Sequence, residues 1–327
     1  MVRSWVATTL TGEDGLELQD SPAVVCGPGQ VRIRNRALAL NFPDCLITRG
    51  LYQLKVDPPF VPGSECAGDV LEVGADIRGI RVGDRVLSLC GVGAFTDEVV
   101  VTPPMQQVHV IPDEMSYAEA AAFAMTYGTG LHALRQRGRL EAGETVLVLG
   151  SAGGCGSAAV GIAAAMGARV IAGASSAEKC AVARAAGAHE TIGYSTEPLR
   201  DRVMELTGGA GVDVVFDPVG DKLFDEAKRC IAWNGRYLVI GFAGGDIPTL
   251  GANYTILKSM SLVGVAFGMS AIKDPATNAD NFHQLFQWYA EGRLRPHVGT
   301  VTTFDQLPQA AAELYAGRAV GKTVIEI

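Results

Sequence analysis

Positive charge is scarce in this chain of 327 residues. Lysine and arginine number 27 against 35 aspartates and glutamates, and the net charge at neutral pH is −8. No broad positive field is available to attract nucleic acid or anionic lipid, so neither is expected as a partner. Charged residues of all kinds reach only 19%, whereas hydrophobic residues reach 48%. That balance excludes intrinsic disorder and predicts a folded chain with a sizeable core.

Paired cysteines and an apolar leader are also lacking. The seven cysteines are odd in number and none forms a C-x-x-C arrangement, so neither a disulfide framework nor a zinc ribbon is indicated. The chain reaches Glu13 and Asp14 without an apolar core, which predicts no secretory signal and a cytoplasmic location. Thr145–Ala168 carries no charge over 24 residues, but four glycines within residues 150–156 would interrupt a membrane-spanning helix. No membrane association is therefore expected.

Two textures divide the chain. From Gly29 to Val101, short β-rich runs alternate with turn signals, which predicts an antiparallel sheet or partial barrel. After Pro112, alanine-rich helical stretches alternate with apolar runs, which is the pattern of a parallel sheet. The expected strands of that sheet are Thr145–Leu149, Arg169–Ala172, Val212–Phe216, Arg236–Ile240 and Ser261–Val265. Two helices, Phe282–Tyr289 and Gln309–Leu314, and a last strand, Thr323–Ile327, are expected to return to the first domain.

The strongest chemical signal lies after the first of these strands. An alanine-rich helix running to Gly167 follows a turn composed of Gly150, Ser151, Ala152, Gly153, Gly154, Cys155 and Gly156. Glycine permits the sharp turn and lets the backbone approach a diphosphate, which the amides at a helix N-terminus attract. Strand, turn, helix and second strand together favour a dinucleotide site over a simple tight turn.

The sequence also favours one nicotinamide cofactor. NAD sites carry an acid about 20 residues beyond the glycines, at the end of the second strand. Ser175 stands nineteen residues past Gly156, and Lys179 follows shortly, whereas Glu178 lies beyond the strand end. Hydroxyls and an ammonium suit the 2′-phosphate of NADPH, although Lys179 is equally compatible with an ordinary solvated helix residue.

Several motifs together carry a resemblance over nearly the whole chain. They are Asn41–Asp44 with Gly50 and Tyr52, Pro62–Gly68, Val82–Val86, Thr126–Gly130, the glycine turn, Asp217–Gly220 and Gly317–Lys322. The chain resembles the medium-chain dehydrogenase/reductase superfamily, and within it the zinc-free quinone oxidoreductase branch. The resemblance implies an α/β fold with a GroES-like β-rich catalytic domain of residues 1–122 and 267–327. It further implies a doubly wound parallel-sheet Rossmann domain of residues 123–266.

The metal ligands of the zinc enzymes in this superfamily are missing. Their three places correspond to Asn41, Ser64 and Met125, and the four-cysteine structural lobe is absent. We therefore expect no metal, and we expect Glu65 to be structural, partnering Arg85 or another buried cation. Without a Lewis acid to stabilise an alkoxide, a zinc alcohol dehydrogenase is disfavoured. Hydride transfer to an electron-poor acceptor needs mainly positioning and is favoured.

The resemblance also implies site residues. Asn41 and Tyr52 would line the acceptor cleft as catalytic candidates, Asn41 donating its amide to a carbonyl oxygen or the cofactor, or serving only as a turn residue. Tyr52 would donate a proton or simply stack on the acceptor. Thr126, Thr129, Gly241, Phe242 and Phe267 would lie near the nicotinamide, unless the threonines are helix caps and the phenylalanines core. Ser175, Lys179, Tyr194 and Arg318 would contact the 2′-phosphate.

These expectations favour an NADPH:quinone oxidoreductase that acts on a small electrophilic acceptor. An enoyl reductase acting on the C=C bond of enones, 2-alkenals or enoyl-CoA is the alternative. A redox-silent NADPH-binding protein is a further alternative from another functional class, since fold alone does not establish turnover. The apolar strand Ser261–Val265 would be a liability as a bare sheet edge, so we expect a homodimer that pairs it across a two-fold axis.

Overall fold

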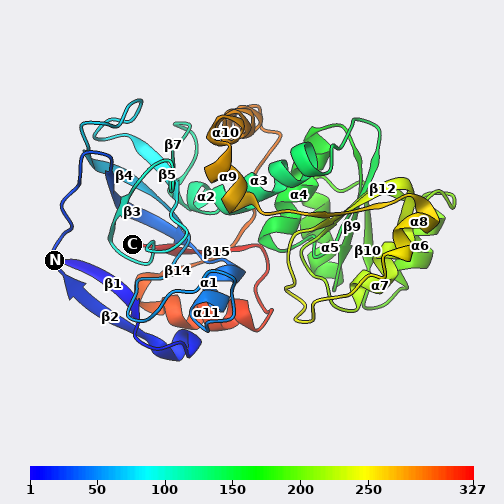
Figure 1. The fold of residues 1–327 in the computed structure, drawn as a ribbon, viewed down its shortest axis with the longest axis horizontal. Helices are drawn as coiled ribbons and strands as arrows, with labels where there is room; N and C mark the ends of the chain where they lie inside the picture. The colour runs from blue at the N-terminus through cyan, green and yellow to red at the C-terminus, as the bar shows by residue number, and fades with distance from the viewer. The chain divides into compact units, whose positions relative to one another are not determined.

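The computed structural model describes residues 1–327, which form two compact units. The first unit comprises Met1–Met125 and Val298–Ile327, and the second comprises Thr126–His297. In Figure 1 the first unit runs from blue to cyan, with its C-terminal segment in red, and the second runs from green to orange. The first unit is therefore built from two stretches of the chain, and the second from one.

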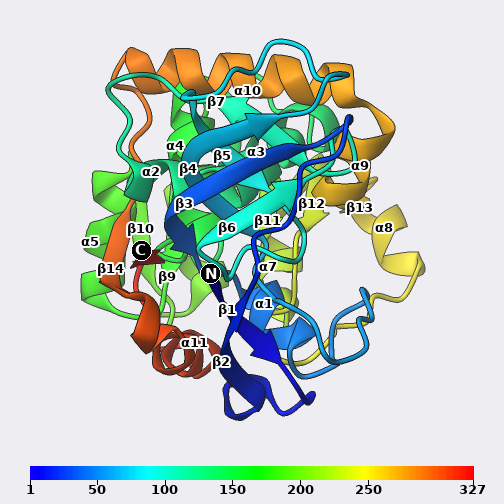
Figure 2. The same ribbon diagram turned by 90° about the vertical axis from the view of Figure 1, so that its left-hand side faces the viewer.

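The first unit is rich in β-structure. A sheet of seven strands has the order β14-β15-β3-β4-β5-β7, with β6 pairing β3, and β1 and β2 form a separate antiparallel hairpin that is dark blue in Figure 2. The strands are β1 (Val2–Ala7), β2 (Leu16–Ser21), β3 (Val31–Ala39), β4 (Glu65–Val73), β5 (Arg85–Leu89), β6 (Glu98–Val101), β7 (Gln107–Val110), β14 (Val298–Thr303) and β15 (Lys322–Glu326). The helices are η1 (Gly12–Gly15), α1 (Phe42–Ile47), α2 (Tyr117–Ala121), η4 (Phe304–Gln306) and α11 (Leu307–Tyr315).

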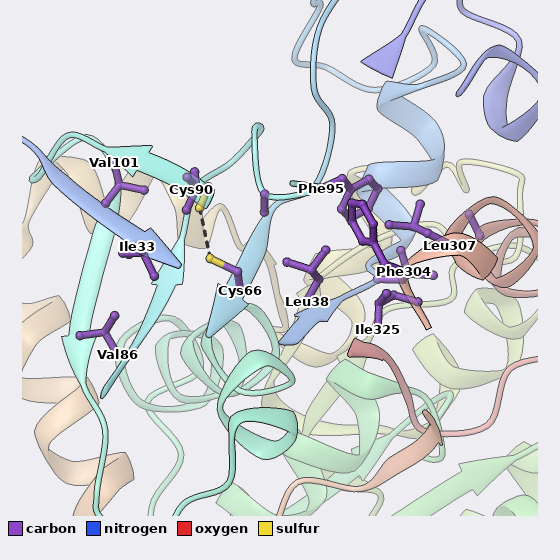
Figure 3. Close-up of a cluster of buried hydrophobic side chains, with 14 of the residues drawn as sticks. Ile33, Leu38, Cys66, Val86, Cys90, Phe95, Val101, Phe304, Leu307 and Ile325 are labelled. Carbon is purple, nitrogen blue, oxygen red and sulfur yellow. Dashed lines mark hydrogen bonds between the residues drawn. The ribbon is translucent and has the colours of Figure 1, made fainter. Parts of the chain in front are cut away.

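Alternation of side chains explains why β3 forms at the centre of this sheet. Val31 and Ile33 are fully buried, while the arginines between and after them point outward, as the two-residue period of a strand requires. The core beneath contains Phe95 and Phe304 (Figure 3). Two thiols, those of Cys66 and Cys90, face one another there with their sulfurs 3.9 Å apart. The neighbouring thiol and burial raise the pKa of Cys66, which keeps it protonated and unreactive.

The second unit contains a six-stranded parallel sheet in the order β10-β9-β8-β11-β12-β13. Its strands are β8 (Thr145–Val148), β9 (Arg169–Ala174), β10 (Glu190–Gly193), β11 (Val212–Asp217), β12 (Ile231–Val239) and β13 (Ser261–Gly264). Its helices are α3 (Ala124–Leu131, entered from the first unit), η2 (His132–Arg137), α4 (Gly154–Ala165), α5 (Ala177–Ala185), α6 (Leu199–Leu206), α7 (Leu223–Ala227), η3 (Lys228–Cys230), α8 (Asn253–Lys258), α9 (Phe267–Lys273) and α10 (Pro275–Ala290). Successive strands extend the sheet outward from β8 in both directions, so the predicted doubly wound sheet is confirmed.

The C-terminal segments are distributed differently from the expected arrangement. Helix α10 lies in the second unit, where Asn281 exchanges hydrogen bonds of 2.8 and 3.2 Å with Gln136 of η2. Leu294 packs against Gly161 of α4. Of these segments, β14, η4, α11 and β15 belong to the first unit, so the division falls at Val298 rather than at residue 267. None of the helices combines the length and apolar character needed to span a bilayer.

Candidate active site

The glycine turn joins β8 to α4 in a geometry that excludes other residues. Gly150 has a φ of +56°, and a Cβ on Gly156 would lie 2.2 Å from the Gly150 carbonyl oxygen. Gly153 is the N-cap of α4 and is exposed, and a Cβ there would meet only the Gly150 oxygen, at 3.4 Å. The first amides of a helix have no partner within it and attract anions. The turn therefore fits the diphosphate of a dinucleotide.

Ser151 holds the glycine turn to the neighbouring strand. Its hydroxyl donates to the Gly173 carbonyl oxygen at 2.9 Å, and its amide donates to the same oxygen at 3.1 Å. Both donors therefore tie the turn to β9 inside the unit, and a contact between Ser151 and the cofactor remains a prediction. Ala152 is buried beside it, whereas Gly154 and Cys155 are half-buried at the start of α4.

Two hydroxyls meet at the carboxyl ends of neighbouring strands. Ala174 of β9 is paired with Gly193 of β10, so the next residues, Ser175 and Tyr194, lie side by side and each carries a hydroxyl. Burial raises the pKa of Tyr194, which therefore remains a neutral donor. Lys179 lies half-buried in the first turn of α5, where its amide donates to the cap residue before the helix. This end of the sheet offers donors where an NAD site offers a carboxylate.

Arg318 belongs to the first unit. Its guanidinium forms an ion pair with Glu313 near the end of α11, with Nη2 at 2.8 Å from Oε1. A contact between Arg318 and the 2′-phosphate remains a prediction.

A buried carboxylate, which the sequence placed in a motif without a role, shapes the neighbouring turn. Asp217 at the end of β11 accepts hydrogen bonds from the amides of Val219 (2.8 Å) and Gly220 (2.9 Å) and from the Tyr237 hydroxyl (2.6 Å). Burial raises the pKa of Asp217 despite these donors. The turn it holds packs beside the glycine turn, since a Cβ on Gly150 would meet Val219 Cγ2 at 2.9 Å.

The loop after β12 continues the same edge of the sheet. The Gly241 amide donates to the Asp217 carbonyl oxygen at 3.4 Å. The half-buried Phe242 ring lies against Gly220, where an added Cβ would be 3.0 Å from its Cδ1. Both residues thus stand at the strand ends where doubly wound sheets bind their ligands.

Helix α3 and Phe267 pack together in the second unit. A Cβ on Gly128 would lie 2.3 Å from Phe267 Cζ, so only glycine leaves room for the ring. Phe267 is 5% exposed, which matches the alternative that it is a core residue. Thr126 and Thr129 are also buried, and they lie within α3 rather than capping its start.

A buried ion pair is the central feature of the first unit. Lys322 Nζ lies 2.6 Å from Glu65 Oε1, and it also donates to Asn41 Oδ1 at 2.7 Å and to the Leu40 carbonyl oxygen at 3.0 Å. Glu65 Oε2 accepts from the Met125 amide at 2.8 Å. Glu65 is fully buried and Lys322 nearly so. This lysine is the buried cation that Glu65 was expected to need.

Arg85, the other expected partner of Glu65, is engaged elsewhere. Its guanidinium donates to the carbonyl oxygens of Asp113 and Met115 and lies over the Tyr117 ring, 4.6 Å from the centroid.

The side chain of Asn41 is hydrogen-bonded within the same cluster. Its Nδ2 donates to Glu65 Oε1 at 2.9 Å and to Ser64 Oγ at 3.0 Å, and its amide donates to Asp44 Oδ2 at 2.8 Å in a capping box at the start of α1. Both side-chain protons and the side-chain oxygen thus have partners. The residue caps α1 and ties it to β4, in keeping with the alternative of a turn residue, and a contact of Asn41 with an acceptor or the cofactor remains a prediction.

Two further groups complete the description of this unit. Burial raises the pKa of Asp44 to about 7, so its carboxyl group is partly protonated at neutral pH. Tyr52 lies half-buried in the loop between α1 and β4.

Comparison with known proteins identifies the family. Residues 27–113 match the alcohol dehydrogenase GroES-like domain, and residues 154–289 match the zinc-binding dehydrogenase family. The quinone oxidoreductase-like protein 2 homolog of Nematostella vectensis is 38% identical to 91% of this chain, over 82% of its own length. The chain belongs to the zinc-free quinone oxidoreductase branch of the medium-chain dehydrogenase/reductase superfamily.

Two further relatives agree with this membership. The quinone oxidoreductase of Pseudomonas aeruginosa is 36% identical over 96% of both chains. A solved mycobacterial structure in complex with NADPH is 29% identical, covers 100% of both chains and has a TM-score of 0.92. As a member of the quinone oxidoreductase branch, the chain is an oxidoreductase with a GroES-like unit and a Rossmann-like sheet, as predicted.

The name of one matching family raises the question of zinc. Asn41 and Ser64, which stand at two of the ligand positions, are an amide and a hydroxyl hydrogen-bonded to each other, and Met125 offers a thioether. Zinc in such sites prefers thiolates, imidazoles and carboxylates. The adjacent carboxylate of Glu65 already pairs with the Lys322 ammonium, whose charge would repel a dication. The residues present therefore do not fit a zinc ion.

Proposed function

We propose that this member of the quinone oxidoreductase branch is a zinc-independent NADPH:quinone oxidoreductase. The observation that carries the proposal is that Ser175 and Tyr194 lie side by side at the ends of β9 and β10, so that hydroxyl donors and not a carboxylate follow these strands. A 2′-phosphate needs donors, whereas free ribose hydroxyls need an acceptor. The NADPH complex of the mycobacterial relative supports the same cofactor.

Each group of residues has a distinct part in this proposal. NADPH, when bound, supplies a hydride from C4 of its nicotinamide. The amides at the start of α4 hold the diphosphate, and Lys179 adds a positive charge near the ribose phosphate. Tyr52 binds the acceptor, while protons for the reduced quinone come from water. Such a reaction needs orientation more than acid catalysis, which suits a site with no group poised as a strong acid.

The proposal predicts a specific pattern of turnover. Chelator-treated protein is expected to oxidise NADPH with para-benzoquinone and naphthoquinone, and to use NADPH at least about tenfold better than NADH in kcat/KM, which corresponds to ~1.4 kcal/mol of phosphate recognition. Initial rates with both cofactors test this, with a 2-alkenal and crotonyl-CoA as parallel acceptors. Lys179→Met should lower the preference, and exposed Lys273→Met should leave it unchanged.

Other results would contradict the proposal in distinct ways. Turnover confined to the alkenal or the thioester would establish an enoyl reductase. NADPH binding without oxidation by any acceptor would indicate a redox-silent binding protein. Loss of quinone turnover after chelator treatment would indicate a metal-dependent reaction. A preference for NADH over NADPH would contradict the role of Ser175 and Lys179 in binding the 2′-phosphate.

We also propose a homodimer paired through β13. This strand has a neighbour on one side only, β12, and Leu262 on it is 45% exposed. Unpaired edges recruit a second strand, and a two-fold axis lets each copy cover the other. Light scattering at micromolar concentration should give a dimer for the parent and a monomer for Leu262→Arg. Val25→Arg, at an exposed residue of the first unit, should remain dimeric; a monomeric parent would contradict the proposal.

A further inference from the structure

The ion pair of Lys322 and Glu65 lies among the residues that replace the metal ligands. Lys322 Nζ directs its protons to three oxygens, those of Leu40, Asn41 and Glu65, at 3.0, 2.7 and 2.6 Å. An ammonium has three donors, so this geometry uses all of them. The three hydrogen bonds thus fix the position of the ammonium relative to all three oxygens.

The ammonium and its oxygen partners belong to three segments that are far apart in the sequence. Lys322 begins β15, Glu65 begins β4, and Asn41 caps α1. Through its second oxygen, Glu65 also binds the amide of Met125, the last residue of the first of the two stretches that form this unit. One ammonium therefore fixes the start of α1 and, through the carboxylate, the point where the chain leaves this unit.

Stability alone does not account for such a pair. Two buried charges lose their hydration, and a neutral pair of similar shape is often as stable. What the ion pair adds is direction, because a misplaced partner would leave a charge unpaired in the core at high cost. A metal ion likewise fixes the positions of its ligands relative to one another.

We propose that the Lys322 ammonium takes the structural place of the absent metal and is a positioning residue for the acceptor site. It acts through Asn41 and Glu65, which set the first turn of α1 and hence the loop carrying Tyr52. The catalytic part of this inference rests on the proposed function; the positioning part does not.

Three variants test the inference: Lys322→Met, Glu65→Gln and the double variant. Each single change leaves one buried group uncompensated, so we expect the melting temperature to fall by about 10 °C. The double variant should regain more than half of that loss, because no buried charge remains unpaired. Lys273→Met, which removes an exposed ammonium, is the matched control and should behave as the parent.

The ordering of the start of α1 is measured separately from the stability of the whole protein. In the double variant we expect amide hydrogen exchange in residues 41–47 to stay at least about tenfold faster than in the parent, despite the recovered melting temperature. The kcat/KM for the acceptor should stay at least about tenfold lower. The NADPH Kd should change less than twofold, since the glycine turn, Ser175 and Lys179 lie in the second unit.

The outcomes separate the two proposals. If the double variant regains the parental exchange rates and the parental kcat/KM together with the melting temperature, the positioning role of Lys322 is wrong. The ion pair would then contribute only to the stability of the fold. Parental behaviour of Lys322→Met would overturn it as well. If the parent reduces no acceptor, the proposed function fails, while the exchange rates and the melting temperatures still decide the positioning role of Lys322.

Discussion

Gly156→Ala is expected to abolish dinucleotide binding. The new Cβ would stand 2.2 Å from the Gly150 carbonyl oxygen and 2.8 Å from Ser151 Cα, and both are backbone atoms that cannot rotate away. The turn must open, which moves the first amides of α4 away from the diphosphate. We expect the NADPH Kd to rise at least 100-fold, or about 2.7 kcal/mol, in a fluorescence titration.

Two companion variants make this result interpretable. Gly153→Ala adds a Cβ that meets only the Gly150 oxygen, at 3.4 Å, so the fold should be retained while the space next to the helix start is filled. It should weaken NADPH binding by about tenfold without lowering the melting temperature. Gly29→Ala, at a half-buried site with no atom within 4 Å of the added group, should change neither. A Gly156→Ala protein that binds NADPH within threefold of the parent would remove the glycine turn from the site.

Asp217→Ala is expected to produce the largest loss of stability among single changes in the second unit. The carboxylate accepts three hydrogen bonds at the end of β11, and its removal leaves the Tyr237 hydroxyl without its acceptor in a fully buried position. Each stranded donor costs about 1–3 kcal/mol. We expect the free energy of unfolding in urea to fall by about 4 kcal/mol.

Tyr237→Phe is the matched control for that loss. It removes the hydroxyl together with the need for an acceptor, and the two turn amides keep their partner. The cost should be about 1 kcal/mol. Equal losses for Asp217→Ala and Tyr237→Phe would show that the amides of Val219 and Gly220 contribute nothing through Asp217.

The sequence predicted the parallel sheet well because buried strands can be recognised in a sequence as apolar runs. Thr145–Val148 is such a run, and the turn after it requires glycine at Gly150 and Gly156. β10 escaped prediction for the opposite reason: Ile192 is the single fully buried residue in it, and its neighbours are polar or small. An edge strand of this kind forms because β9 offers it hydrogen bonds, which no local pattern records.

Residue roles were harder to predict than elements. Asn41 and Ser151 stand in the expected turns, yet their donors point into the protein, and the direction of a short polar side chain is decided by neighbours distant in sequence. The Glu65–Lys322 pair spans 257 positions. A lone acid among apolar and small residues does signal a buried cation, but composition cannot tell which of 27 lysines and arginines supplies it.

The first unit consists of two separate stretches of the chain, and this affects the order in which the units can fold during synthesis. Its central strand β3 needs β15 as a neighbour, and Glu65 needs the ammonium of Lys322, yet both partners follow the second unit in the chain. Residues 1–125 are thus synthesised before the second unit but cannot complete their core until that unit has also been made. The second unit, a single uninterrupted stretch, can fold while translation continues. The core of the first unit is therefore completed after the second unit, although most of its residues precede it.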